Sequence, residues 1–429
     1  MTKRDAKDEK KAPKLRFKGF TDDWEHGQVK DIAKRITRKN KNNESNLPLT
    51  ISAQDGLMAQ ENFFDKQVAS KDLSNYLLLY KGDFAYNKSY SNGYPYGAVK
   101  RLEHYDSGVV SSLYITFKPI TVDSDFLAEY YEATNWHKEI YKRAAEGARN
   151  HGLLNITAND FFEGSIVYPK NLSEQKRIGS LFQNLDRTIT LHEEKQKQLE
   201  QLKKGLSQKL FADKIGFPEI RFKGFGVPWE QCKFGNLFKF LQNNTLSRAS
   251  LNNENGYGQN VHYGDVLIKY HEILDTSKIR LDYIPSKDTV DKYKKSFLEN
   301  GDIIIADTAE DETVGKCTEI LGLTKQKVIS GLHTIPVRPK RKFAPGYLGF
   351  YLNSNAYHNQ LRPLMQGIKV TSISKSSIKN TKVMYPVDLD EQDKISKMLI
   401  NMDSLISANQ QKIDQLKSLK QALLQQMFI

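Results

Sequence analysis

Two long stretches of the chain carry apolar residues at steps of three and four, the spacing of one face of an α-helix. The first runs from Ser173 to Phe211 and the second from Asp390 to Phe428, and their apolar positions coincide at an offset of 217 residues. We expect Ser173 and Asp390 to be the N-caps. The predicted apolar seam consists of Ile178, Leu181, Leu185, Ile189, Leu199, Leu202, Leu206 and Leu210 in the first helix, and of Ile395, Met398, Met402, Ile406, Leu416, Leu419, Leu423 and Met427 in the second.

A helix of this length would span about 60 Å at about 1.5 Å per residue, which is more than an ordinary domain needs. Two equivalent apolar stripes in one chain most simply bury each other, so the sequence predicts an antiparallel intramolecular coiled coil. His192 and Asn409 interrupt the two seams at matching positions. Polar residues inside a seam lower stability but can fix the register of the pairing.

The segment before each helix is repeated as well. Leu15–Glu25 (LRFKGFTDDWE) has its counterpart 205 residues later in Ile220–Glu230 (IRFKGFGVPWE). A whole unit, globular module plus helix, therefore occurs twice, and the near-equal halves predict an approximate two-fold axis. The expected boundaries are a solvated tail at residues 1–13, module 1 at 14–171, a first helix at 172–213, module 2 at 214–387 and a second helix at 388–429.

The two modules differ in sequence but share a predicted skeleton. Gly82-Asp83 and Gly301-Asp302 form a turn that leads into a buried strand in each half. Residues 109–119 and 328–339 each predict one further strand, residues 126–141 and 347–361 predict helices, and a short strand ends at a Tyr-Pro pair before each long helix. The fold class is therefore α+β, with two modules that alternate with two long helices in a pseudo-two-fold arrangement.

Composition narrows the range of functions. The chain has 64 Lys and Arg against 51 Asp and Glu, which gives a net charge of +13 and favours a polyanionic partner. Its two cysteines, Cys232 and Cys317, are too few for a disulfide framework, and no apolar run reaches membrane-spanning length. The charged N-terminal segment reads as a solvated tail and not as a signal peptide. These features predict a cytoplasmic protein.

The ordered set of repeated motifs resembles the specificity (S) subunit of type I restriction–modification enzymes. The resemblance covers essentially the whole chain and rests on the duplicated RFKGF…W segment, the Gly-Asp turns, the Tyr-Pro-x-x-x-x-Glu-Gln passages that begin at Tyr168 and Tyr385, and the two long helices. It implies two target-recognition domains, each of which reads one half of a split sequence in double-stranded DNA. It also implies two modification (methyltransferase) subunits and ATP-dependent restriction subunits as partners, and no catalysis by the S subunit itself.

Short motifs of catalytic or cofactor sites are present only as incomplete matches. Phe222–Gly226 matches an FxGxG S-adenosylmethionine pattern, but the repeat has Thr21 at the last position and no apolar strand precedes the motif. Neither an Asn-Pro-Pro-Tyr-type methylation motif nor a GxxxxGK[ST] loop for ATP occurs in the sequence, and His262, Cys317 and His333 lack metal-ligand spacing. We therefore expect no cofactor or metal in this chain; S-adenosylmethionine, ATP and Mg would be bound by the partner subunits.

Gly-rich polar loops are the best candidates for DNA contacts, because cations neutralise phosphates and Arg, Lys or Asn can read base edges. Two such loops occur in module 1, at residues 86–101 and 143–152, and module 2 has an equivalent of the second in residues 366–377. The other loop of module 2, residues 307–316, is acidic. The simpler expectation is that this loop turns away from DNA. The predicted DNA-binding residues are Asn87, Lys88, Tyr90, Asn92, Lys100, Arg143, Arg149, Asn150, His151, Lys316, Lys369, Thr371 and Lys375.

Two other functions remain open at this point. A two-headed coiled-coil adaptor that binds only proteins would explain the architecture without DNA. Absence of salt-dependent DNA binding by the complex with methyltransferase subunits would favour that function. A self-sufficient methyltransferase is disfavoured by the missing motifs.

Overall fold

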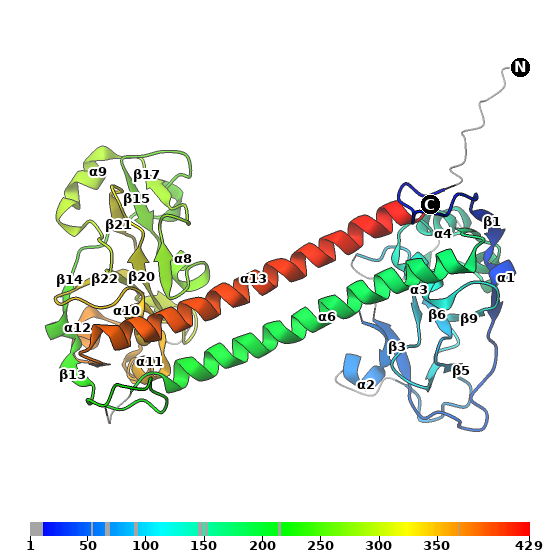
Figure 1. The fold of residues 1–429 in the computed structure, drawn as a ribbon, viewed down its shortest axis with the longest axis horizontal. Helices are drawn as coiled ribbons and strands as arrows, with labels where there is room; N and C mark the ends of the chain where they lie inside the picture. Colours follow the sequence, from blue (N-terminus) through cyan, green and yellow to red (C-terminus); the bar gives the residue numbers. More distant parts are fainter. Residues whose placement is uncertain are drawn as a thin grey trace, which may run out of the picture. The chain divides into compact units, whose positions relative to one another are not determined.

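The computed structural model describes residues 12–429 except 53–54, 65–68, 90–92, 145–148, 151–152, 213–215 and 368. The chain divides into two compact units (Figure 1). Unit 1 comprises the chain up to residue 193 together with residues 411–429, and unit 2 comprises residues 194–410. Each unit contains one module and one part of each long helix.

The two long helices predicted from the apolar stripes are present as α6 (Leu172–Lys209) and α13 (Leu389–Met427). The predicted N-caps were wrong, because both helices begin earlier. The Oδ1 of Asn171 accepts a hydrogen bond from the Ser173 amide (2.8 Å), and the Oδ1 of Asp388 accepts one from the Asp390 amide (2.8 Å). Each cap thus lies two residues before the predicted one.

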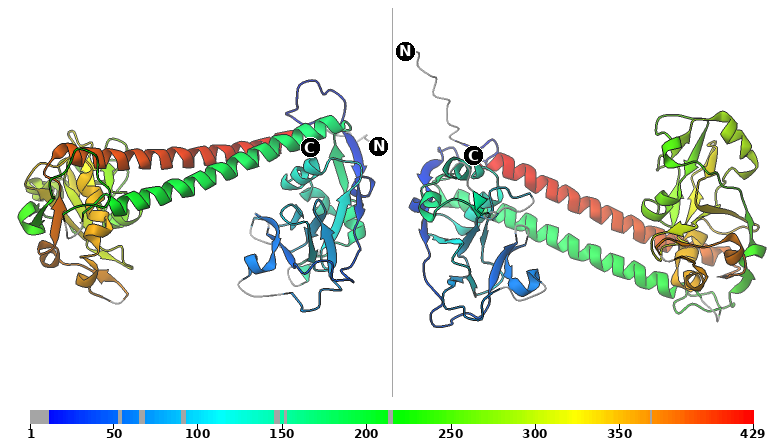
Figure 2. Two further views of the ribbon diagram at one scale, coloured as in Figure 1. Left: turned by 60° about the horizontal axis from the view of Figure 1, so that its bottom comes forward. Right: turned by 180° about the vertical axis from the view of Figure 1, so that it is seen from behind.

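The helices pair antiparallel within each unit, where the views show them side by side (Figure 2). In unit 1, Lys420 of α13 contacts Asp186 of α6 (2.6 Å). In unit 2, Asn409 of α13 donates to Gln196 of α6 (3.0 Å), so this polar seam residue is bonded across the pair. As the residue number rises along one helix, it falls along the other, which is the predicted antiparallel coil.

The predicted seam needs one correction. Leu202 and Leu419 are 52% and 48% exposed, although they occupy seam positions at the same repeat offset. The buried apolar residues that sequence spacing did not select include Phe182, Leu399, Ile413 and Leu424. The coil therefore shifts its buried face along its length, because a straight helix of 3.6 residues per turn drifts relative to a strict seam.

Module 1 is built on a four-stranded sheet of order β2-β9-β6-β7, accompanied by the pairs β1-β12, β3-β4, β5-β8 and β10-β11. Apolar side chains of β6 and β9, such as Phe84 and Phe117, are fully buried. The strands are β1 (Glu25–Gln28), β2 (Ala33–Arg35), β3 (Leu49–Ser52), β4 (Gly56–Ala59), β5 (Leu77–Tyr80), β6 (Phe84–Asn87), β7 (Ala98–Arg101), β8 (Ser107–Val110), β9 (Ile115–Pro119), β10 (Arg149–Asn150), β11 (Leu153–Leu154) and β12 (Ser165–Tyr168). The helices are α1 (Val29–Ile32), α2 (Gln60–Phe63), α3 (Ser124–Glu132), α4 (His137–Arg143) and α5 (Ala158–Phe162).

Module 2 is built on a five-stranded sheet of order β14-β22-β18-β20-β16, with a three-stranded sheet β17-β15-β21 and the pairs β13-β24 and β19-β23. The strands are β13 (Glu230–Lys233), β14 (Phe238–Phe240), β15 (Gly258–Val261), β16 (Ile273–Asp275), β17 (Asp282–Ile284), β18 (Ile303–Ala306), β19 (Thr308–Ala309), β20 (Cys317–Leu321), β21 (Val328–Ser330), β22 (Thr334–Pro339), β23 (Thr371–Ser372) and β24 (Lys382–Tyr385). The helices are α7 (Phe234–Leu237), α8 (Tyr263–Ile268), α9 (Lys287–Lys292), α10 (Tyr347–Asn353), α11 (Asn355–His358) and α12 (Lys375–Lys379).

One predicted strand per module proved to be two. Residues 109–119 include the end of β8 and all of β9, which belong to different sheets, and residues 328–339 divide in the same way into β21 and β22. The turn between each pair lies at Ser111–Tyr114 in module 1 and at Gly331–His333 in module 2. Both strands of each pair are apolar, so the run looked continuous in sequence although it changes sheet at a short polar turn.

The repeated motifs hold each module to the start of a long helix. In unit 1, Arg16 of the RFKGF segment makes two hydrogen bonds to Glu174 (2.6 and 2.7 Å), whose side chain is 0% exposed. In unit 2, Arg221 binds Glu391 in the same way (2.7 and 2.8 Å). A planar guanidinium matches a carboxylate at two points, which explains why Arg and Glu recur together in the two repeats.

The glutamine next to each of these glutamates links the helix to two further segments. Gln175 donates to the Pro169 carbonyl (2.7 Å) and accepts from the Asp123 amide (2.6 Å). Gln392 makes the same pair of bonds with Pro386 (2.7 Å) and Ala344 (2.9 Å). The Tyr-Pro and Glu-Gln motifs are thus parts of one buried joint between module and helix.

Candidate nucleic-acid interface

The structure places the first predicted loop of module 1 against the segment that directly follows the second. The amide of Leu154 donates to the carbonyl of Lys88 (3.1 Å), and the Lys88 ammonium donates to the carbonyl of Ile156 (3.1 Å). The first loop follows β6 and the second follows α4. Two segments about 60 residues apart in sequence therefore meet at one edge of the module.

Module 2 has the same arrangement. The amide of Ile373 donates to the carbonyl of Asp307 (2.8 Å), and β19 pairs with β23 so that Thr308 lies opposite Ser372. Lys88 and Asp307 are related by 219 residues, as are Leu154 and Ile373. We call this region of each module the two-loop surface, which consists of the described residues within 87–97 and 143–156 in module 1 and within 307–316 and 362–375 in module 2.

The predicted residues of module 1 occupy varied positions. Asn87 accepts from the Ser89 amide (3.0 Å), and Arg143 donates to the Glu163 carbonyl (2.6 Å). Lys100 is only 10% exposed and forms an ion pair with Glu132 (2.5 Å), so a neighbouring carboxylate already balances its charge. Arg149 and Asn150 form strand β10, which pairs with β11. Tyr90, Asn92 and His151 lie outside the described residues.

In module 2, Lys369 and Lys375 are exposed on the second loop and at the start of α12. Thr371 donates to the carbonyls of Ala309 (3.2 Å) and Asp311 (3.0 Å), which joins the two loops. Lys316 is half-buried and donates to the Leu267 carbonyl (2.7 Å), and burial lowers the pKa of its ammonium. Lys369 and Lys375 are therefore the predicted cations of this module that face solvent.

The acidic loop of module 2 lies directly beside the Lys369 segment. Three of its carboxylates already have partners: Asp307 accepts from the Thr308 hydroxyl (2.8 Å), Asp311 accepts from the Thr313 amide (2.9 Å), and Glu312 lies 3.6 Å from Arg362. The pairing of β19 with β23 holds the acidic loop against the second loop, and the expectation that it turns away from DNA stays a prediction. Negative charge on this surface can accept hydrogen bonds from a cytosine amino group.

Two further residues that contact the two-loop surfaces were missed in the sequence. His333 has a left-handed backbone (φ 56°), and its Nδ1 lies 3.4 Å from the Asp307 carboxylate. The segment 328–339 has 12 residues, whereas the equivalent segment 109–119 has 11. This extra residue was the available sign in the sequence that the two turns differ. In module 1, Tyr141 is 71% exposed, and its ring meets Tyr96 edge-on with centroids 6.5 Å apart. An exposed helical tyrosine had no distinguishing sequence signal.

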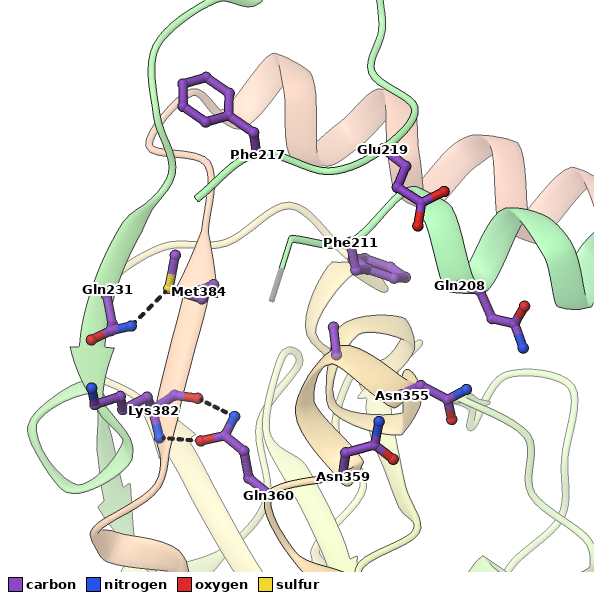
Figure 3. Close-up of a pocket in the computed structure, with 11 residues that line it drawn as sticks. Gln208, Phe211, Phe217, Glu219, Gln231, Asn355, Asn359, Gln360, Lys382 and Met384 are labelled. Carbon is purple, nitrogen blue, oxygen red and sulfur yellow. Dashed lines mark hydrogen bonds between the residues drawn. The ribbon is translucent and has the colours of Figure 1, made fainter. Parts of the chain in front are cut away.

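Each unit also contains a groove away from the two-loop surface. The groove of unit 2 has a volume of about 720 Å³ and is lined by the end of α6, by β13 and β24, and by residues around α11 (Figure 3). Gln360 in this groove exchanges two hydrogen bonds with the backbone of Lys382 (2.9 and 3.0 Å). The equivalent groove of unit 1 measures about 860 Å³. Of the predicted DNA-binding residues that the structure describes, none lines either groove.

Among the described residues, no helix is long and apolar enough to cross a membrane, and no group of three or more His, Cys, Asp or Glu side chains is placed to hold a metal ion. The structure therefore offers no metal centre in its described part around which a reaction could be argued.

Comparison with known proteins agrees with this architecture. Residues 226–418 match the model of the type I restriction modification DNA specificity domain. The type I restriction enzyme MjaX specificity subunit of Methanocaldococcus jannaschii is 27% identical over 164 residues. That alignment covers 37% of this chain and 37% of the relative, so it spans well under half of the relative's length.

Solved structures match over nearly the whole chain. The type I restriction–modification S subunit of M. genitalium is 14% identical and gives a TM-score of 0.52 over 97% of this chain and 99% of its own. A chain from a study of complex assembly and conformational transition of the type I restriction–modification system is 16% identical and also gives 0.52, over 94% and 96%. The HsdS subunit of Thermoanaerobacter tengcongensis is 17% identical over 94% and 96%, with a TM-score of 0.48.

The chain is similar to type I specificity subunits. The whole-length matches place both modules and both long helices within the fold of an S subunit, as the repeated motifs predicted. In this chain, the repeated residues hold modules to helices, whereas the two-loop surfaces carry residues that differ between repeats. Recurring motifs are therefore structural here, and the variable loops are the candidates for recognition.

Proposed function

We propose that this chain is the DNA-recognition subunit of a type I restriction–modification system. Each module reads one half of a bipartite DNA target through its two-loop surface, and the chain directs adenine methylation by modification subunits and cleavage by restriction subunits. The observation that carries the proposal is the pair of two-loop surfaces, which have equivalent frames but different side chains, in a chain related to specificity subunits.

The charge of the chain supports DNA as the partner. A net charge of +13 attracts a polyanion over a long range, and exposed cations such as Lys369 lie on the two-loop surface. The differing loops support two separate half-sites, because base readout depends on which side chains reach the groove edges. We propose that the chain itself has no methyltransferase, nuclease or ATPase activity and that S-adenosylmethionine, ATP and Mg bind to the partner subunits.

Methylome sequencing tests this function. Cells that contain the chain with its cognate modification subunits should show adenine methylation at a split motif, and cells without the chain should not. Exchange of residues 14–171 for those of a relative should change one half of that motif, and exchange of residues 214–387 should change the other half. A motif that changes in both halves, or that does not depend on the chain, would contradict modular recognition.

A protein-only adaptor makes the opposite prediction. The complex of the chain with its modification subunits would then bind duplex DNA no better than the modification subunits alone, at any salt concentration. Measurable methyl transfer by the purified chain without partners would in turn contradict its non-catalytic role. The same preparations therefore separate the proposed function from both alternatives.

A further inference from the structure

Two lysines of module 1 face each other across neighbouring strands. Lys34 of β2 lies directly opposite Lys118 of β9 in the antiparallel register, and both side chains are exposed. Neither ammonium group forms an ion pair with any residue in the described part of the chain. Side chains in such pairs have Cβ atoms about 5 Å apart, and like charges placed directly opposite destabilise a sheet.

In module 2, the charge of the cation at the equivalent position is neutralised by a carboxylate. Lys239 lies opposite Arg338 in the equivalent strands β14 and β22. Arg338 binds both carboxylate oxygens of Asp302 (2.8 Å each), and Asp302 is 1% exposed. The cation of the inner strand thus has an internal role in module 2, where it balances the buried aspartate of the Gly-Asp turn.

In module 1, another residue has taken over that role. The aspartate of its Gly-Asp turn, Asp83, is 6% exposed and is bound by Arg38, which also donates to the Leu78 carbonyl (2.9 Å). Lys118 therefore has no buried carboxylate to balance. The protein retains a cation at this position although the structural demand for it is met elsewhere.

Protection of a sheet edge does not account for the pair. Lysine on an edge strand discourages pairing with other chains, which would explain Lys34 on β2. β9, however, is an inner strand, with β2 on one side and β6 on the other, so Lys118 protects no edge. An anion between the two ammonium groups would remove their repulsion and would use both charges.

We propose that Lys34 and Lys118 form a phosphate-binding pair that contacts the DNA backbone beside module 1. This inference rests on the proposed function. Phe117 pairs with Phe84 at the start of β6, and the two-loop surface begins at the end of the same strand, at Asn87. Along this strand, the lysine pair and the two-loop surface are separated by three to four residues, or about 12 Å at about 3.3 Å per residue. This distance is close to the width of the major groove, about 12 Å. If the loops of module 1 enter the major groove of a duplex, the phosphate backbone that borders this groove is within reach of Lys34 and Lys118.

The test is the salt dependence of DNA binding by the full chain with its modification subunits. Each phosphate contact adds about 0.9 to the slope of log K against log salt concentration. The Lys34→Ala/Lys118→Ala variant should lower the magnitude of that slope by about 1 to 2 on both target and non-target duplexes. The ratio of target to non-target affinity should stay unchanged, because phosphates carry no sequence information.

A matched variant controls for net charge. Lys41→Ala/Lys71→Ala removes two exposed lysines of the same module, and its slope should stay near that of the wild type. Lys34→Arg/Lys118→Arg should also retain the slope. A change in salt slope no larger than that of the control overturns the inference. Weaker binding to the modification subunits with an unchanged DNA slope also overturns it, because the pair would then be a protein contact. If the wild-type complex itself shows no salt-dependent DNA binding, the proposed function fails first.

Discussion

Lys420 of α13 and Asp186 of α6 form an ion pair in unit 1, with Nζ 2.6 and 2.7 Å from the two carboxylate oxygens. Unit 2 contains the same pair at the repeat-equivalent positions, since Lys203 lies 2.6 Å from Asp403. Each lysine also approaches a glutamate of its module: Lys420 lies 3.9 Å from Glu129 and Lys203 lies 3.2 Å from Glu272. The helices therefore share one register in the two units.

A double-mutant cycle should reveal the strength of this pair. We expect Asp186→Ala and Lys420→Ala to show a coupling free energy of about 1–2 kcal/mol, because Lys420 is only 18% exposed. In the neighbouring pair Glu193–Lys417 (2.7 Å) the lysine is 56% exposed, and this pair should couple by about 0.5 kcal/mol or less. Urea unfolding of the four variants in each cycle supplies both values. Equal coupling in the two cycles would show that burial does not strengthen the Lys420 pair.

Glu129 should make the stability of unit 1 depend on pH. Burial raises the pKa of its carboxyl to about 8, and Lys420 opposes the shift. Between the ordinary value of 4.5 and about 8, the folded state therefore holds a proton at this site that the unfolded state has lost. The free energy of unfolding should fall as pH rises through this window. Glu129→Gln, which cannot ionise, should flatten the decline.

Hydrogen exchange of the α3 amides as a function of pH measures this effect within unit 1, because α3 carries Glu129. The difference between wild type and Glu129→Gln should be largest near pH 5 to 8, after correction for intrinsic exchange rates. Unit 2 amides provide the control, since the substitution does not touch that unit. Parallel pH profiles for the two proteins would contradict the assigned role of Glu129.

The Arg–Glu joints should be sensitive even to conservative changes. Arg16→Ala leaves the carboxylate of Glu174 buried without its partner, and we expect a loss of about 3 kcal/mol in unfolding free energy. Arg16→Lys should recover only part of that loss, because an ammonium group cannot make the paired contacts of a guanidinium. Adding Glu174→Gln to Arg16→Ala should restore some stability by removing the uncompensated charge. Thermal unfolding of these variants measures whether their stabilities follow this order.

The frame of this protein was predictable because it is repeated. A single helical stripe would have been ambiguous, but the coincidence of Leu199 with Leu416 and of Arg16 with Arg221 at fixed offsets marked a duplicated unit. Partners such as Glu174 could not be assigned from sequence, since the two residues lie 158 positions apart and only the fold brings them together.

The candidate recognition surface could be placed on loops from the sequence, but its residues could not be assigned. Gly-rich polar segments marked both loops of module 1, yet Lys100 proved to be paired internally with Glu132. Nothing in local sequence distinguishes a lysine that faces solvent from one that faces a carboxylate across a strand. Lys34 and Lys118 were missed for the same reason, because their register appears only when β2 and β9 pair.

Arg149 and Lys369 remain our predicted DNA contacts in the two equivalent second loops. If a residue contacts phosphate, its change to Ala should weaken binding uniformly across sequences and make the salt slope shallower by about 1. If it reads a base, the same change should cost about 1–3 kcal/mol and relax specificity at one position of one half-site. Binding assays on a panel of single-base target variants separate these outcomes. Unchanged affinity for both variants would move the contact surface elsewhere.

The long helices should set the distance between half-sites. Each is continuous from one unit into the other, and each unit fixes their register through its own Lys–Asp pair. An insertion in one helix alone would shift Lys203 away from Asp403, so the informative variant has four extra residues in both helices. One insertion is placed after Gln196 in α6 and the other before Asn409 in α13. These positions leave every residue pair between the two helices intact.

Four residues add about one helical turn, roughly 6 Å at about 1.5 Å per residue, and nearly preserve the apolar stripe. That displacement corresponds to one or two base pairs at about 3.4 Å each. We therefore expect the doubly inserted chain to methylate the same two half-sites with a gap longer by one or two base pairs, as read from the methylome. The variant with the α6 insertion alone should lose stability and activity, because its helix register is broken. Full activity of the double variant at the original spacing only would show that the helices do not measure the DNA.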